Sequence, residues 1–336
     1  MIAADVVRPE VVALSAGQHD LIQYAMTVAG LALFAQFLWT WRSTGEVGAR
    51  YRTAAHASLA IAAVAALSYA YLVLKFDQGY TYADGTYFPN AEALNTLTPR
   101  YMDWSVTVPL LMVEFLAVSG LVGARARVVR AALVTAAFLM IFTGYLGATV
   151  DGAGTDQTEL LVWGLVSTAF YAALYVLLIR VLRSSKGSMS AQAYASYRNA
   201  AIVLLSVWGW YPIAYAIHNW LPGAGWTTTI QVGFSFADIA AKIGFGVLIH
   251  KVAKLRTAED VHAGEQTHPE DVWISSVKES DGVQPLLKGV VLTDGGEGAR
   301  PLTGPGGTAD VAEGGARTAD VTSTERSRHR EQPDRP

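Results

Sequence analysis

Two charged residues, Asp238 and Lys242, stand inside the otherwise apolar stretch WTTTIQVGFSFADIAAKIGFGVLIHKVA. Their spacing of four residues places both side chains on one face of a helix, one turn apart. A lysine amine that burial keeps neutral can attack an aldehyde and form a Schiff base. The pair could instead neutralise itself and serve the structure alone. Because Lys242 is the only lysine near the middle of an apolar stretch, we favour a covalent attachment site.

A second set of ionisable residues lies in the stretch TPRYMDWSVTVPLLMVEFLAV, which contains Arg100, Asp103, Thr107 and Glu114. Asp103 and Thr107 share a helix face, and Glu114 follows Asp103 by about three turns, or roughly 16 Å. Ionisable residues inside an apolar span indicate function by default. Glu114 could snorkel from a helix end, but its neighbours are almost all apolar. Carboxyl groups on one face at different depths are what a proton path requires.

These residues need membrane-spanning helices to position them. A span needs about 20 predominantly apolar residues, and 52% of the 336 residues are hydrophobic. Glycine and proline residues separate several of the apolar stretches. We predict an all-α membrane protein, a seven-transmembrane-helix bundle with spans at about residues 18–42, 51–76, 99–121, 127–150, 158–183, 197–220 and 226–254.

The connections between these spans alternate in charge. Segments 42–52, 124–130 and 180–198, and the residues after the seventh span, are rich in arginine and lysine. The other three connections are acidic or neutral. The positive-inside rule places the basic set in the cytoplasm. The sequence therefore predicts a multi-pass protein of the cell membrane, in contact with the lipid bilayer, with the N-terminus outside and the C-terminus cytoplasmic.

The composition of the two terminal segments differs from that of the apolar middle of the chain. We predict an extracellular N-terminal segment at 1–17, the membrane domain at 18–256 and a disordered cytoplasmic tail at 257–336, which is polar and nearly free of aromatic residues. The tail is either a solvated appendage or a partner-binding segment. The start MIAADVVRPE lacks the basic and apolar regions of a signal peptide. The absence of cysteine excludes disulfides and thiolate metal sites.

The charge balance and motifs exclude other function classes. A net charge of −3 gives no argument for nucleic-acid binding. We find no nucleotide-binding loop and no metal-binding cluster, so we expect no metal site and no hydrolytic enzyme chemistry.

Five motifs together carry a family resemblance. They are the run RYMDWSVTVPLLMVE, the Asp238–Lys242 pair, MIFTG at 140–144, WGLVST at 163–168 and WGWYP at 208–212. With these motifs, residues 18–256 resemble a microbial (type I) rhodopsin. The resemblance implies that Lys242 binds all-trans retinal as a protonated Schiff base. It also implies that Asp103 and Asp238 are the counter-ions, in a region ordered by Arg100, Tyr69 and Tyr211.

The resemblance also implies a retinal pocket. Aromatic and aliphatic side chains from several spans would enclose the polyene, and smaller residues would surround its ring. The implied pocket consists of Trp104, Leu111, Met140, Gly144, Ser167, Thr168, Trp208, Pro212 and Tyr215. In proteorhodopsins a leucine at the position of Leu111 favours green absorption, so the resemblance implies absorption in the green.

The triplet Asp103, Thr107 and Glu114 resembles that of the bacterial proton pumps of the proteorhodopsin and xanthorhodopsin type. This resemblance implies the bacterial plasma membrane as the location. In the family, a chloride pump lacks the first carboxylate, and a sodium pump has Asn, Asp and Gln at these positions. The resemblance implies a light-driven ion transporter, not an enzyme, that moves protons outward with Asp103 as acceptor and Glu114 as donor. Two alternatives remain: a photosensory rhodopsin that signals through its tail, and a seven-helix receptor without retinal.

The chain departs from the family pattern at several positions. Ser68 stands where the proteorhodopsin type has a histidine, and His56 lies about twelve residues earlier. The sixth connection, HNWLPGAGWTTT, lacks the two glutamates that archaeal pumps use for proton release. Gly164 stands where archaeal relatives have a tryptophan. It either packs closely against a helix or opens a window for a hydroxylated carotenoid antenna. The family usually forms trimers or pentamers, so we expect a homo-oligomer.

Overall fold

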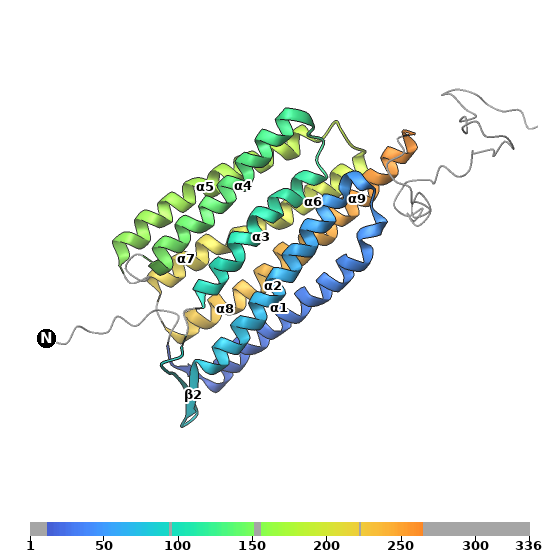
Figure 1. Cartoon of the computed structure of the whole chain (residues 1–336). Helices are drawn as coiled ribbons and strands as arrows, with labels where there is room; N and C mark the ends of the chain where they lie inside the picture. Colours follow the sequence, from blue (N-terminus) through green and yellow to red (C-terminus); the bar gives the residue numbers. More distant parts are fainter. Residues whose placement is uncertain (1–11, 94–95, 151–155, 222, 265–336) are drawn as a thin grey trace, which may run out of the picture. The chain divides into compact units, whose positions relative to one another are not determined.

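The computed structural model of the chain describes residues 12–93, 96–150, 156–221 and 223–264. Nine α-helices are found in these residues, and Figure 1 shows that they form a bundle in which some helices follow one another end to end. They are α1 (Ala16–Ser43), α2 (Arg52–Gln78), α3 (Leu97–Ala117), α4 (Gly123–Tyr145), α5 (Gln157–Ser184), α6 (Ala191–Trp208), α7 (Trp210–Trp220), α8 (Ala224–Asp238) and α9 (Phe245–His262).

The seven predicted spans are present, and three of them are not regular α-helix throughout. The fourth continues from α4 into the π-helical segment η3 (Leu146–Val150). The sixth is α6 followed by α7, with the break at Gly209. Pro212 has no N–H, so it cannot bond the carbonyl of Trp208. The seventh is α8, the π-helical segment η5 (Ile239–Gly244) and α9 in one continuous run. A π-helical turn loosens the regular helix at Lys242, and such turns are frequent at functional sites.

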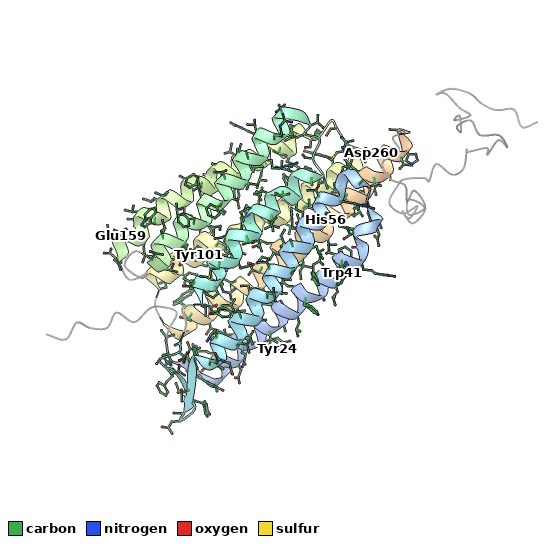
Figure 2. All side chains as sticks on the ribbon, in the orientation of Figure 1. Tyr24, Trp41, His56, Tyr101, Glu159 and Asp260 are labelled. Carbon is green, nitrogen blue, oxygen red and sulfur yellow. The ribbon has the colours of Figure 1, made fainter. Side chains whose placement is uncertain are left out.

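Six of the seven spans are long and apolar enough to cross a membrane within the described part of the chain. The remaining helix, α3, contains Arg100, Asp103 and Glu114, which lower its apolar character. Large apolar side chains cover the outer faces of the bundle. Figure 2 shows Tyr24 and Trp41 of α1 pointing outward, and both are mostly exposed. This exposure agrees with a helical membrane bundle in contact with lipid.

The start of the sixth span differs from the prediction by six residues. Ser190 Oγ accepts a hydrogen bond from Ala193 N at 3.2 Å and caps α6, so the helix begins at Ala191. Residues 191–196 belong to the same helix as the predicted span, so its start at 197 was placed too late.

One end of the bundle carries a small sheet that we did not predict. Strands β1 (Leu14–Ser15), β2 (Tyr80–Ala83) and β3 (Thr86–Pro89) are antiparallel in the order β1-β3-β2. Asp84 and Gly85 have φ of 48° and 80°, as a two-residue hairpin turn requires. The Asp-Gly pair between aromatic residues was the sequence signal. We call this side the hairpin end, and the side with Glu46 and Thr257 the opposite end.

At the opposite end, α9 extends beyond the expected boundary of the membrane domain. Gly48 N donates to Thr257 Oγ1 at 2.9 Å, and Tyr51 OH donates to Asp260 Oδ2 at 2.7 Å. These contacts hold the last turns of α9 against the α1–α2 connection. Residues 257–262 are therefore helical, which corrects the predicted start of the tail. The predicted disorder of 265–336 lies outside the described residues.

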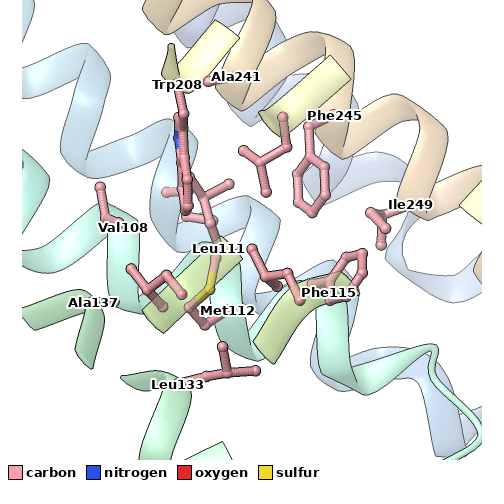
Figure 3. Packing of buried hydrophobic residues seen from close by; sticks show 14 of the residues in the cluster. Val108, Leu111, Met112, Phe115, Leu133, Ala137, Trp208, Ala241, Phe245 and Ile249 are labelled. Carbon is pink, nitrogen blue, oxygen red and sulfur yellow. The ribbon is translucent and has the colours of Figure 1, made fainter. Parts of the chain in front are cut away.

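The largest apolar cluster lies between α3, α4, α6 and α9. Figure 3 shows Leu111, Met112 and Phe115 of α3 close to Trp208 and Phe245. All five are buried. This packing fixes α3 against the seventh span, and these two elements carry the ionisable residues.

We expect Thr257→Val to lower the free energy of unfolding by about 1–3 kcal/mol, because the buried Gly48 N–H would lose its acceptor. Thr229→Val is the matched control. The Thr229 hydroxyl is exposed and bonds only within its own helix, so its loss should change stability by less than about 0.5 kcal/mol. Thermal unfolding in detergent measures both variants. Equal midpoints for the two would contradict this role of Thr257.

Candidate functional site

The amine of Lys242 lies between two carboxylates inside the bundle. Its Nζ is 2.5 Å from Asp103 Oδ2 on α3 and 3.3 Å from Asp238 Oδ1 on α8. All three side chains are buried. The predicted Asp238–Lys242 pair is thus present, and Asp103 makes the shorter contact. Desolvation of charged groups is costly, so such contacts are required to keep them in the interior.

Asp238 is held by three hydrogen-bond donors from other helices. Tyr211 OH donates to Oδ1 at 2.8 Å and Tyr69 OH donates to Oδ2 at 2.9 Å. Trp104 Nε1 donates to Oδ1 at 3.3 Å. This set stabilises a carboxylate. Asp103 is different, because its Oδ1 has no hydrogen-bond partner among the described residues.

Arg100 completes the group of charges on the side of the hairpin end. Its Nη1 lies 3.7 Å from Asp238 Oδ2 and donates to Tyr69 OH at 3.1 Å. Its Nη2 donates to Gln231 Oε1 at 3.1 Å, and Gln231 Nε2 donates to Thr96 Oγ1 at 2.6 Å. With both basic side chains protonated and both carboxyls ionised, the charges of Arg100, Lys242, Asp103 and Asp238 sum to zero. A neutral sum makes their burial tolerable.

A cavity of about 530 Å³ lies beside this charge cluster. Trp104 and Tyr211 line the cavity and also bond Asp238, so the cavity and the cluster share a wall. This volume suits a small apolar ligand. Eight of the nine predicted pocket residues line it: Trp104, Met140, Gly144, Ser167, Thr168, Trp208, Pro212 and Tyr215.

Leu111 and Thr107 are placed differently from the other predicted residues. Leu111 is buried but does not line the cavity, and it packs in the apolar cluster that contains Trp208. Thr107 Oγ1 donates to the backbone carbonyl of Asp103 at 3.0 Å rather than to an ionisable group. Ser68 makes no hydrogen bond with Asp103 in the described structure.

Gly164 lies where the cavity approaches the outer face of the bundle. It lines the cavity together with Leu161 and Leu165, whose side chains are exposed. A Cβ at Gly164 would lie 3.0 Å from Tyr215 Cε1, so the glycine lets the Tyr215 ring come close. The predicted window position is therefore at the side of the cavity.

Glu114 is separate from the charge cluster. It follows Asp103 by eleven residues on α3, is 1% exposed, and neither carboxyl oxygen has a hydrogen bond of standard geometry within the described part of the chain. A Cβ at Gly246 would be 2.9 Å from Ser58 Oγ, 3.5 Å from Glu114 Oε1 and 3.6 Å from Gln36 Nε2. These polar atoms from α1, α2 and α3 therefore converge on Gly246, whose missing side chain leaves room for them.

The sequence reasoning missed Gln231, Gln36 and Ser58. Each is a buried neutral polar residue within an apolar span. Gln231 precedes Asp238 by seven residues, so helix periodicity puts it on the same face two turns away. That spacing was a usable signal for Gln231. No comparable spacing pointed to Gln36 or Ser58, which lie on other helices than Glu114.

The arrangement is suited to proton movement rather than to hydrolysis. An amine contacts a carboxylate with one unpartnered oxygen, and a second carboxyl is buried further along the same helix. The cavity can hold an apolar group against the cluster. Lys242 Nζ is the nucleophile in the cluster that could attach such a group covalently.

Residues 20–255 match the model of the family described as bacteriorhodopsin-like protein. Bacteriorhodopsin-I of Haloarcula marismortui is 29% identical over 213 residues, which is 62% of this chain and 80% of the relative. Cruxrhodopsin-3 of Haloarcula vallismortis is 29% identical over 241 residues, which is 70% and 91% of the two chains.

Solved structures give the same result for the fold. Xanthorhodopsin, described as a light-driven ion pump with dual chromophore, is 31% identical with a TM-score of 0.67. The match covers 74% of this chain and 98% of xanthorhodopsin. A thermophilic rhodopsin is 30% identical with a TM-score of 0.68, and the match covers 74% of this chain and 99% of that rhodopsin.

We expect Asp238→Asn to lower the free energy of unfolding by about 3–5 kcal/mol, because it leaves a net positive charge in the buried cluster. Glu92→Gln is the matched control, since Glu92 is exposed and forms no ion pair in the described structure. The midpoint of thermal unfolding in detergent measures both. A midpoint for Asp238→Asn equal to that of the control would show that charge balance does not stabilise the bundle.

Proposed function

This chain is a member of the bacteriorhodopsin-like family, and we propose that it is a light-driven pump that moves protons out of the cell. The observation that carries the proposal is the 2.5 Å contact between Lys242 Nζ and Asp103 Oδ2, with Glu114 further along the same helix. Two carboxyls on α3 thus stand at different depths, and only one contacts the amine.

All-trans retinal fits the site as the cofactor. Lys242 Nζ would hold it covalently, and the cavity lined by Trp104, Trp208 and Tyr215 would enclose its apolar body. When bound, retinal supplies light absorption and an isomerisation that turns the Nζ–H bond toward different partners. Relatives named as rhodopsins, including xanthorhodopsin with its dual chromophore, support this assignment.

The orientation follows from the charges of the connections. Basic residues at the opposite end and acidic or neutral ones at the hairpin end favour a cytoplasmic opposite end. Helix α3 runs from Leu97 near the hairpin end, so Arg100, Asp103 and Glu114 follow one another toward the cytoplasm. A proton that moves from Glu114 toward Asp103 therefore moves outward.

The residues of this chain would act in a fixed order. Lys242 Nζ gives its proton to Asp103 Oδ2, which makes the shortest contact with it. Asp238 stays ionised, since Tyr69, Tyr211 and Trp104 donate to it. Glu114, buried with no hydrogen bond of standard geometry in the described structure, holds a proton at rest and then resupplies Nζ.

Arg100 would hold the polar groups between the charge cluster and the outer surface in place. It links Asp238 and Tyr69 to Gln231, whose amide continues to Thr96. Polar groups therefore lead from the charge cluster to the N-terminal turn of α3. A proton leaving Asp103 would follow this direction.

A carotenoid antenna is a finer part of the proposal. The side of the cavity at Gly164 lies beside exposed Leu161 and Leu165, where a lipid-dissolved molecule could approach. Tyr215, against Gly164, would contact both this molecule and the cavity. A hydroxylated carotenoid could pass absorbed energy to retinal at this short range.

A photosensory rhodopsin is the second candidate function. The feature that favours it is the polar segment 265–336, which could bind a signalling partner. The buried Glu114 favours a pump, since a nearby proton donor shortens the photocycle. We also propose, from the family resemblance, that the protein forms a homo-oligomer, either a trimer or a pentamer, in the membrane.

We expect cells with the protein and retinal to acidify their medium under light, and a protonophore to abolish the effect. Lys242→Ala should give neither colour nor acidification, because the attachment nitrogen is gone. Asp103→Asn should lower acidification about tenfold or more, and Glu114→Gln should slow the recovery after a flash by about 10²-fold. Asp20→Asn, an exposed acid, is the control and should pump normally. Normal pumping by Asp103→Asn would refute the assigned acceptor.

We expect Gly164→Trp to remove the carotenoid bands from the action spectrum of acidification and to leave the retinal band, because the indole would fill the side of the cavity. Gly187→Trp is the matched control, since nothing lies within 4 Å of a Cβ there. Protein reconstituted with a hydroxylated carotenoid provides the measurement. If the parent protein shows no carotenoid bands, it has no antenna.

A further inference from the structure

A histidine with an acidic and a basic neighbour lies at the opposite end of the bundle. His250 Nε2 of α9 is 3.5 Å from Glu46 Oε2, and Lys254 Nζ donates to the same oxygen at 3.2 Å. Glu46 belongs to the 3₁₀ turn η1 (Thr44–Glu46) that follows α1. The side chain of His250 is 8% exposed, whereas that of Glu46 is 36% exposed. The group therefore reaches from solvent into the bundle.

His250 lies one turn from the pocket of Glu114. Gly246, at which Glu114, Ser58 and Gln36 converge, precedes His250 by four residues on α9. Residues four apart share a helix face and are separated by about 6 Å along the axis. The imidazole therefore stands on the Glu114 side of α9, between the carboxyl and the end of the bundle.

A second set of polar atoms lies along α1, between the region of Glu114 and the opposite end of the bundle. Gln36, whose amide nitrogen faces Gly246 as the Glu114 carboxyl does, donates to Thr40 Oγ1 at 3.1 Å, one turn further on. Trp39 packs its ring edge against His250, with ring centroids 4.9 Å apart. Both α1 and α9 thus lead polar side chains from Glu114 toward Glu46.

The chemistry of His250 suits a proton carrier. An imidazole is the side chain that ordinarily gains and loses a proton between pH 5 and 8. The ionisable groups that face it are Glu46 from η1 and Lys254 from α9, and Trp39 of α1 covers its ring. Nothing in the proposed transfer from Glu114 to Lys242 uses these residues.

We propose that His250, assisted by Glu46, collects protons from the cytoplasmic side and delivers them to Glu114. A proton from solvent passes by way of Glu46 Oε2 to the imidazole, and then through water beside Ser58 and Gln36 to the Glu114 carboxylate. His250 returns to its neutral form, so no other reactant is consumed. This inference rests on the proposed function, in which Glu114 is the donor that must be refilled.

The test measures the access of protons to Glu114 in the dark, without pumping. Full-length protein in lipid is transferred to D₂O, and infrared spectroscopy follows the shift of the Glu114 carboxyl band, which Glu114→Gln identifies by its loss. We expect His250→Asn to slow this exchange at least about tenfold, in line with the effect of losing a proton carrier. His56→Asn is the matched control, since His56 is exposed on α2 and should exchange like the parent.

A second variant and a rescue keep the result interpretable if His250→Asn is unstable. Glu46 is partly exposed, so Glu46→Gln should fold normally and slow the exchange by a smaller factor. Imidazole in the buffer should restore the exchange in His250→Asn. Unchanged exchange in His250→Asn and Glu46→Gln would overturn the inference. Failure of Glu114 as a donor would appear separately, as normal recovery of Glu114→Gln after a flash.

Discussion

Charge balance inside an apolar bundle is the constraint on which this structure depends. Arg100 and Lys242 oppose Asp103 and Asp238, and all four side chains are buried. An uncompensated charge in this position would cost several kcal/mol. Helix α3 must therefore present Arg100 and Asp103 to the same point at which the seventh span presents Asp238 and Lys242. The packing of α3 against α6 and α9 keeps these partners in register.

The buried carboxyl groups differ in their hydrogen bonding. Asp238 accepts three hydrogen bonds from tyrosine and tryptophan side chains. Among the described residues, one oxygen of Asp103 has no hydrogen-bond partner, and neither oxygen of Glu114 accepts a hydrogen bond of standard geometry. Hydrogen bonds to the ionised form of a carboxyl favour that form. The local bonding thus distinguishes Asp238 from Asp103 and Glu114, the two carboxyls to which the proposal gives a proton. A pump of the proposed kind needs this division.

Much of this could be predicted from residue spacing. Apolar length located the seven spans, and the ionisable residues within them identified the charge cluster, because polar groups in lipid are rare enough to stand out. The cap at Ser190 and the extension of α9 were missed, since they depend on single hydrogen bonds to Ala193, Gly48 and Tyr51. The hairpin at 80–89 carried an Asp-Gly signal that the search for spans passed over. Gln36 and Ser58 could not be linked to Glu114, because only the packing of α1, α2 and α9 brings them together.

The most direct test of the central claim is the light-induced infrared difference spectrum of the retinal-loaded protein. Transfer of a proton from Lys242 Nζ to Asp103 predicts that illumination produces the carbonyl band of a carboxylic acid. That band should persist in Tyr211→Phe, which leaves the Lys242–Asp103 contact in place, and should vanish in Asp103→Asn. A carboxylic acid band of undiminished size in Asp103→Asn would contradict the account.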